Sequence, residues 1–171
     1  MRRRAMSVAF VSKTEWSVVR PHVLVVACSD GRYQICLDEF LQGHLSIFNY
    51  DRLYAPGGPG SMASTFEFFR GDQFRKEAGF LIGAHQLEEI ILIFHGTAAG
   101  GPPEAACADY KQKLPFSTDE EIHRQQLQDL VEVIRAIRKI SDNLRLSAYR
   151  AEVVADKRVQ FIQLSLPILQ Y

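Results

Sequence analysis

The stretch HVLVVACSDGR, residues 22–32, decides the fold class of this chain. Its first part, HVLVVAC, is apolar almost throughout and rich in valine, which is typical of a strand buried on both faces. Ser29, Asp30 and Gly31 follow as turn-forming residues that end the strand. A strand covered on both faces belongs to a sheet between two helical layers, so we expect it at the centre of an α/β domain.

Helix and strand patterns alternate along the rest of the chain. In the first half we expect a helix over 33–41, a strand over 46–54, and helical structure over 62–85 with a break at Gly71-Asp72. An apolar strand over 89–95 follows, then a long helix capped by Ser117 and Glu120, and finally strands over 148–154 and 159–166. This order predicts a doubly wound, mainly parallel sheet with helices on both faces. The short connection at 156–158 predicts an antiparallel pair at one edge.

Length and composition indicate one α/β domain. The chain has 171 residues, of which 47% are hydrophobic and 23% charged, and this excludes a disordered chain. Residues 1–20 hold five cations and one acid, so we expect a basic arm over 1–20 and a single domain over 21–171.

Charge and cysteine content limit the expected partners and compartment. Lys and Arg number 20, as do Asp and Glu, so the chain has no net charge to attract nucleic acid or a membrane surface. No apolar run approaches the ~20 residues of a membrane span. Three cysteines do not suggest a disulfide framework, and we expect a cytoplasmic protein.

Reactive side chains follow two of the predicted apolar strands. Cys28 ends the first strand, and His95 ends the strand over 89–95. If the strand order is 2-1-3, these residues lie side by side at the carboxyl ends of the strands, where open α/β sheets bind ligands. Thiolate and imidazole are ligands that Zn²⁺ prefers. The alternative is a small buried cysteine beside a hydrogen-bonded histidine.

Asp30 and Arg32 lie two residues apart directly after Cys28. An adjacent guanidinium keeps a carboxylate ionised and oriented, so Asp30 could orient a water molecule or accept a proton. The alternative is an ion pair that stabilises the loop.

These residues resemble a known motif. Cys28-Ser29-Asp30-Gly31-Arg32 is similar to the C-x-D-x-R motif of β-class carbonic anhydrases, and the resemblance extends over about residues 20–165. It looks closest to a divergent branch whose third strand leads into an H-x-x-C-G-A loop, with Glu120, Glu121 and His123 in the helix that follows. The resemblance implies that Cys28 and His95 are zinc ligands. It also implies that Arg32 holds Asp30, which accepts a hydrogen bond from the metal-bound water.

The sequence departs from that family at residue 98. Ala98 stands where the family has its second cysteine ligand, and alanine cannot bind a metal. We therefore expect a carbonic-anhydrase-like protein with a degenerate zinc site, without normal carbon dioxide hydration, that retains a pocket for a small bicarbonate-like anion. The alternative is an active zinc lyase, a carbonate dehydratase, with Asp30 or Cys107 as a substituted third ligand.

Two further expectations concern assembly and a rival motif. The resemblance and an aromatic-rich segment over 66–80 predict a homodimer, with its phenylalanines in the core or at a subunit interface. Residues 58–63 fit G-x-G-x-x-A between a strand and a helix, which leaves dinucleotide binding as an alternative, or an anion at the helix that follows.

Overall fold

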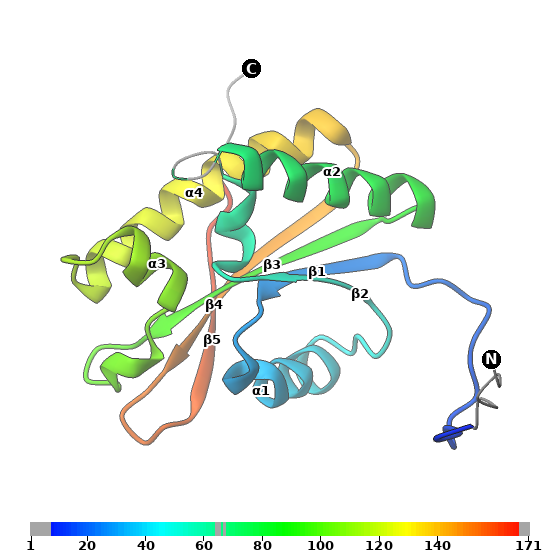
Figure 1. Cartoon of the computed structure of the whole chain (residues 1–171), viewed down its shortest axis with the longest axis horizontal. Helices are drawn as coiled ribbons and strands as arrows, with labels where there is room; N and C mark the ends of the chain where they lie inside the picture. Colours follow the sequence, from blue (N-terminus) through cyan, green and yellow to red (C-terminus); the bar gives the residue numbers. More distant parts are fainter. Residues whose placement is uncertain (1–7, 64–65, 67, 168–171) are drawn as a thin grey trace, which may run out of the picture.

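The computed structural model describes residues 8–63, 66 and 68–167, and its centre is a five-stranded sheet (Figure 1). The strand order is β2-β1-β3-β4-β5. The first four strands are parallel and β5 is antiparallel to β4. Their bounds are β1 Val23–Cys28, β2 Asp51–Ala55, β3 Glu89–Thr97, β4 Arg145–Val153 and β5 Val159–Gln163. The doubly wound α/β fold, the 2-1-3 order and the antiparallel edge pair are confirmed.

Both faces of the sheet are covered because β1 and β3 are apolar at every position in their centres. Leu24 and Val26 of β1 pack beneath α2 (Phe68–His85) and α4 (Asp119–Ile140). Val25 and Ala27 point the other way, toward α1 (Gln34–Glu39) and the π-helical turn η2 (Phe40–His44). Successive side chains of a strand point to opposite faces, so a strand between two helical layers needs apolar residues at odd and even positions alike.

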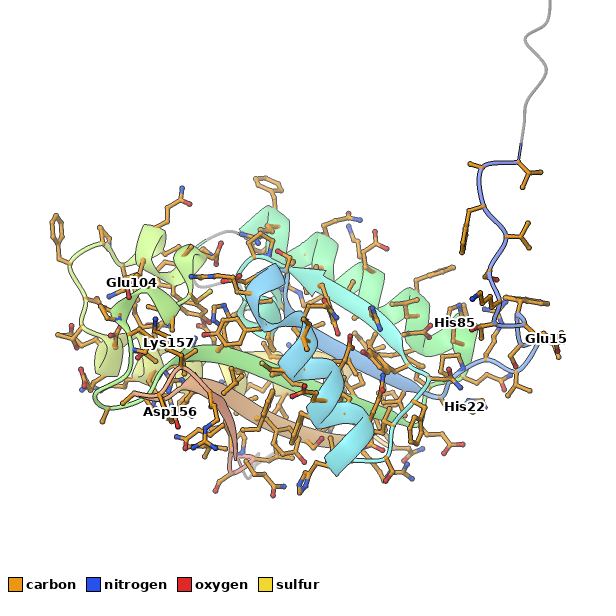
Figure 2. The ribbon with its side chains drawn as sticks, turned by 90° about the horizontal axis from the view of Figure 1, so that it is seen from below. Glu15, His22, His85, Glu104, Asp156 and Lys157 are labelled. Carbon is orange, nitrogen blue, oxygen red and sulfur yellow. The ribbon has the colours of Figure 1, made fainter. Side chains whose placement is uncertain are left out.

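The carboxyl ends of the parallel strands meet at one edge of the domain. Figure 2 shows Glu104 and the β4–β5 turn at this end, and His22 and His85 at the opposite end. Three short helices lie near the ends of the strands: η1 (Gly31–Tyr33) follows β1, η3 (Gly58–Met62) follows β2, and η4 (Pro103–Ala105) precedes α3 (Ala108–Lys113).

Four local predictions are wrong. The second strand begins at Asp51 rather than at 46, and the helical segment after β1 continues through Gly43. Helix α2 has no break at Gly71, whose missing side chain instead makes room for the Ala63 carbonyl, 2.9 Å from where a Cβ would lie. The capping box of α4 is Thr118 with Glu121, one residue later than Ser117 and Glu120.

The aromatic-rich segment is largely exposed rather than part of the core. Phe68, Phe69 and Phe80 of α2 are 64%, 88% and 66% exposed, and Phe74 packs against the core. The expected subunit interface therefore remains a prediction for this face. Among the described residues, no helix is both long and apolar enough to cross a membrane.

The described part of the predicted basic arm, residues 8–20, has no helix or strand and extends away from the sheet (Figure 1). Its large apolar side chains are at least 75% exposed: Val8, Phe10, Val11, Trp16, Val18 and Val19. The arm's arginines at 2–4 lie outside the described residues. The division at residue 20 stays a prediction, although the first regular element begins at Val23.

Gly58 should be needed for stability, because it lies against the end of β1 with a φ of +58°. A Cβ there would lie 2.9 Å from the Cys28 nitrogen and 3.1 Å from the Ala27 carbonyl carbon. We expect Gly58→Ala to lower the free energy of unfolding by about 2 kcal/mol or more in urea titrations. Gly79→Ala is the matched control: its Cβ would meet Ile140 at an ordinary 3.8 Å, and the change should be neutral or stabilise α2 by up to ~1 kcal/mol. Equal losses in both variants would contradict the prediction.

Candidate metal centre

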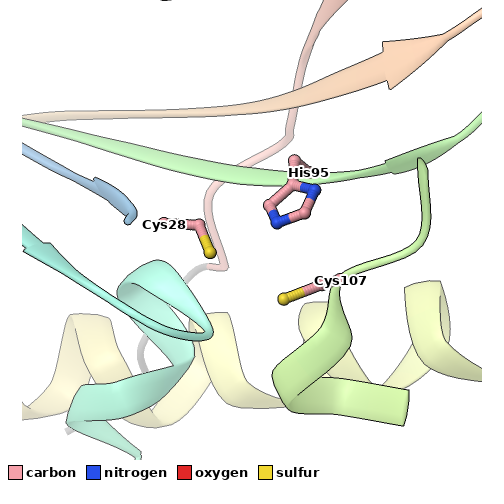
Figure 3. A group of neighbouring side chains, drawn as sticks. All are labelled: Cys28, His95 and Cys107. Carbon is pink, nitrogen blue, oxygen red and sulfur yellow. The ribbon is translucent and has the colours of Figure 1, made fainter. Parts of the chain in front are cut away.

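Three side chains with metal-binding atoms converge at the carboxyl ends of β1 and β3. The Cys28 and Cys107 sulfurs and a His95 ring nitrogen all lie within 4.8 Å of one another. Figure 3 shows the two thiols and the imidazole directed into one common space. In the part of the chain that the structure describes, no other histidine, cysteine or carboxylate group of three or more is as compact.

The sheet places Cys28 beside His95. Strands β1 and β3 are parallel neighbours, with Ala27 opposite Ile93. Cys28 follows Ala27 by one residue and His95 follows Ile93 by two, so both side chains lie at the same edge of the sheet. His95 is 4% exposed and Cys28 is half-buried. The expectation that these two residues are neighbours is confirmed, while their role as metal ligands stays a prediction.

Hydrogen bonds onto two consecutive carbonyls bring Cys107 back to this edge. Arg32 Nη1 donates to the Glu104 oxygen at 2.9 Å, and the Tyr33 hydroxyl donates to the Ala105 oxygen at 2.8 Å. His95 Nδ1 lies 3.3 Å from the same Ala105 oxygen. Cys107 follows two residues later, at the start of α3 and 1% exposed.

The orientation of the His95 ring leaves a lone pair for a ligand. A carbonyl oxygen can only accept a hydrogen bond, so Nδ1 carries the hydrogen and Nε2 has the free lone pair. His95 Nε2 is buried and has no hydrogen-bond partner among the described residues. A histidine with one nitrogen bonded to a carbonyl and the other free is typical of a metal ligand.

The two thiols differ in their acid strength. A hydrogen bond from Cys107 is the main cause that lowers the pKa of Cys28 to about 4, despite burial. The neighbouring Cys28 sulfur and burial raise the pKa of the Cys107 thiol. Without a cation, we therefore expect Cys28 to be a thiolate that accepts a hydrogen bond from the Cys107 thiol. A cation at this position would favour loss of the remaining proton.

This set of atoms fits zinc. Two cysteines, one histidine and an open fourth position form one of the arrangements found in catalytic zinc sites. Zinc bonds of about 2.0–2.3 Å keep tetrahedral ligand atoms roughly 3.5 Å apart. Atoms that all lie within 4.8 Å can therefore reach one ion after small side-chain adjustments.

Asp30 is hydrogen-bonded to Arg32. Asp30 Oδ1 accepts hydrogen bonds from the Arg32 backbone at 3.1 Å and from its Nε at 2.9 Å, and Arg32 Nη2 lies 2.5 Å from Oδ2. These bonds lower the pKa of the Asp30 carboxyl. The predicted Asp–Arg pair is present, but Asp30 is not part of the compact Cys-His-Cys group. The sequence does not reveal that Arg32 also binds the Glu104 carbonyl, because the two lie 72 residues apart.

A second layer of polar side chains positions the three residues. Gln126 Nε2 donates to the His95 carbonyl at 2.9 Å, and Arg150 Nε donates to Gln126 Oε1 at 3.0 Å. On α3, the Tyr110 hydroxyl donates to Asp129 of α4 at 2.5 Å. Gln126, Asp129 and Arg150 are each no more than 3% exposed, and sequence spacing gave no sign of this network.

Ala98 lies in a different hollow from the three residues. Its nitrogen donates to the Val153 carbonyl at 3.0 Å, and it lines a cavity of about 250 Å³ with Glu120, His123 and Arg150. The family motif places a ligand at residue 98, where this chain has alanine; in the structure, Cys107 is the residue that lies beside Cys28 and His95. The G-x-G-x-x-A segment gains no support as a phosphate loop, because Gly58–Met62 is buried and Gly60 packs against the Tyr110 hydroxyl.

The space beside Cys28 and His95 is small and apolar. A cavity of about 10 Å³, room for about one water-sized molecule, opens onto both residues. Its other lining residues are mostly hydrophobic: Ala27, Tyr33, Leu37, Ile93, Phe94, Ala151 and Phe161. The lining gives this space beside Cys28 and His95 an apolar character.

Comparison with known proteins identifies the fold. No protein-family model matches the sequence, and no curated protein matches it significantly. A β-carbonic anhydrase of the fungal pathogen Aspergillus fumigatus is similar at a TM-score of 0.50 and 12% identity, over 88% of this chain and 78% of that chain. A β-carbonic anhydrase of Trichomonas vaginalis gives a TM-score of 0.48 and 15% identity, over 90% and 88% of the two chains. An apo carbon disulfide hydrolase gives 0.45 and 14%, over 83% and 78%. The chain has the β-carbonic-anhydrase fold.

The lowered pKa of Cys28 predicts an unusual pH profile for its alkylation in the metal-free protein. The thiolate is the reactive form, so the iodoacetamide rate at Cys28 should be flat between about pH 6 and 8 and fall only as the pH approaches the pKa of about 4. Peptide mapping by mass spectrometry measures this rate. In urea-unfolded protein the same residue should follow an ordinary thiol profile with a midpoint near ~8.5. Cys107→Ala, which removes the main hydrogen bond, should move the folded midpoint upward; an unchanged midpoint would contradict the assignment.

Proposed function

We propose that this chain is a zinc-dependent lyase of the carbonic anhydrase type that hydrates carbon dioxide. The observation that carries the proposal is the Cys28, His95 and Cys107 group, with all ligand atoms within 4.8 Å and a buried, unpartnered Nε2 on His95. The three residues would hold the ion and leave a fourth position open. The β-carbonic-anhydrase fold supports the same reaction class, although fold alone does not establish an activity.

Zinc, when bound, lowers the pKa of water toward ~7 and so supplies a nucleophile at neutral pH. The chain's own contribution is a fixed proton acceptor. Arg32 keeps Asp30 ionised and oriented, so Asp30 Oδ1 or Oδ2 can accept a hydrogen bond from the attacking water. Arg32 itself is fixed by the Glu104 carbonyl, which places the pair next to the segment that carries Cys107.

The apolar surroundings of Cys28 and His95 suit an uncharged substrate. Carbon dioxide is small, uncharged and without a hydrogen-bond donor, and the side chains around Cys28 and His95, among them Ala27, Ile93 and Phe161, are mostly apolar. Burial of Cys28 and His95 among hydrophobic side chains also strengthens electrostatic interactions at the reacting atoms.

The degenerate site with a small-anion pocket stays the competing prediction. It rested on Ala98 as the missing ligand, and the proximity of Cys107 supplies a third candidate in its place. Metal content separates the two, because a two-residue site would hold zinc poorly. The homodimer and the cytoplasmic compartment also stay predictions; the exposed phenylalanines of α2 support an apolar contact surface.

Cys107 should be required for zinc binding. We expect about one zinc per chain in protein purified without chelators, measured by elemental analysis. Cys107→Ser should lower zinc affinity by at least ~100-fold, because two protein ligands remain. Cys36→Ser is the matched control: Cys36 is a half-buried cysteine of α1 outside the compact group, and its loss should leave the metal content unchanged. Wild-type protein that takes up no zinc would instead favour the degenerate site.

Asp30 should be required for hydration but not for the metal. Asp30→Asn should keep the zinc content and reduce the rate of carbon dioxide hydration by ~100-fold or more, measured by stopped flow. Asp156→Asn is the control, because Asp156 and Arg158 form the same local pair, with Arg158 Nε donating to Asp156 at 2.8 Å, in the exposed turn between β4 and β5. An active Asp30→Asn enzyme would remove Asp30 from the reaction.

A further inference from the structure

We propose that Cys28 and Cys107 are also a reversible disulfide pair, so that the same two residues either bind a metal or bind each other. The inference begins from their geometry. The two sulfurs lie within 4.8 Å, so a disulfide of about 2.05 Å requires them to approach by at most about 2.7 Å. Both residues lie where the backbone leaves a regular element, Cys28 at the end of β1 and Cys107 before the six-residue helix α3.

Differences in exposure assign the two sulfurs distinct roles. Cys28 is half-buried, so a small oxidant can reach it, whereas Cys107 is 1% exposed and is shielded. Cys28 is therefore the sulfur that is oxidised first, and Cys107 is the resolving thiol beside it. Cys36 belongs to α1 and is outside the compact group, so it should take no part.

The reaction balances with hydrogen peroxide as the oxidant. The Cys28 sulfur attacks one peroxide oxygen, the O–O bond breaks, and the leaving hydroxide takes a proton to become water. The Cys107 sulfur then attacks the Cys28 sulfur, the S–O bond breaks and a second water leaves. Two thiols and one peroxide thus give one disulfide and two waters. A dithiol reductant reverses the change by thiol–disulfide exchange.

Metal binding and disulfide formation exclude each other, because zinc binds cysteine as the thiolate and a disulfide sulfur carries no negative charge. The oxidised protein retains His95 alone from the group, so it should not hold zinc. This consequence rests on the proposed function, whereas the disulfide itself depends only on the positions of Cys28 and Cys107.

The test treats the full-length protein with hydrogen peroxide, once after chelator treatment and once after zinc loading, and maps the cysteines by trypsin digestion without reduction. Cleavage after Arg32 separates Cys28 from Cys36, and Lys76 and Lys111 bound the peptide that contains Cys107. We expect a Cys28–Cys107 cross-linked peptide in the metal-free sample, at a mass lower by two hydrogens, and its loss after reduction. Zinc-loaded protein should form it at least ~10-fold more slowly.

Two results would overturn the inference. One is a cross-link that involves Cys36, and the other is sulfinic or sulfonic acid on Cys28 with Cys107 still reduced. The Cys36→Ser variant should form the same cross-link as the wild type. Because the main measurement uses wild-type protein, it does not depend on the folding of a variant at Cys28 or Cys107. If the disulfide forms but zinc neither binds nor slows it, the inference holds and the proposed function fails. If zinc binds but no disulfide forms, the proposed function holds and the inference fails.

Discussion

The candidate site depends on two backbone carbonyls, those of Glu104 and Ala105. Arg32, Tyr33 and His95 all place polar hydrogens on these oxygens, and they come from the ends of both central strands. Burial of the Tyr33 hydroxyl and of His95 makes these bonds costly to lose, because an unpaired buried polar group costs about 1–3 kcal/mol. These contacts of Arg32, Tyr33 and His95 hold the Glu104 and Ala105 carbonyls at the strand ends. They therefore determine the path of residues 98–107 and the position of the Cys107 thiol.

A buried polar network supports the other side of His95. Arg150 contacts Glu152 and Gln126, and Gln126 reaches the His95 carbonyl. Gly96 follows His95 because a Cβ at that position would lie only 2.3 Å from the Arg150 guanidinium. A buried ion pair contributes little net stability, and its better-attested role is to define one arrangement. Here the ion pair and Gln126 hold the backbone of β3 at His95, and so define the direction in which the His95 imidazole points.

The sequence was sufficient for the sheet and insufficient for the third side chain. Continuous apolar runs such as residues 22–28 and 89–95 predict buried parallel strands, and parallel neighbours bring Cys28 and His95 to one edge. Cys107 could not be placed, because its position depends on hydrogen bonds from Arg32 and Tyr33 across more than 70 residues of sequence, which no local pattern encodes. The Asp-x-Arg pattern has limited value by itself: the surface turn at Asp156 and Arg158 has the same local hydrogen bonds. What distinguishes Arg32 is its additional hydrogen bond to the Glu104 carbonyl.

Cys107 lies far along the chain from Cys28, and this separation would link metal concentration to the folding equilibrium if the proposed site binds an ion. An ion bound by residues 28, 95 and 107 closes large loops that are open in the unfolded chain, where no preformed site exists to compete for it. Each tenfold rise in free metal above the dissociation constant then adds about 1.4 kcal/mol to the free energy of unfolding. If the three residues bind zinc as proposed, the ambient zinc concentration would set the fraction of the chain that is folded.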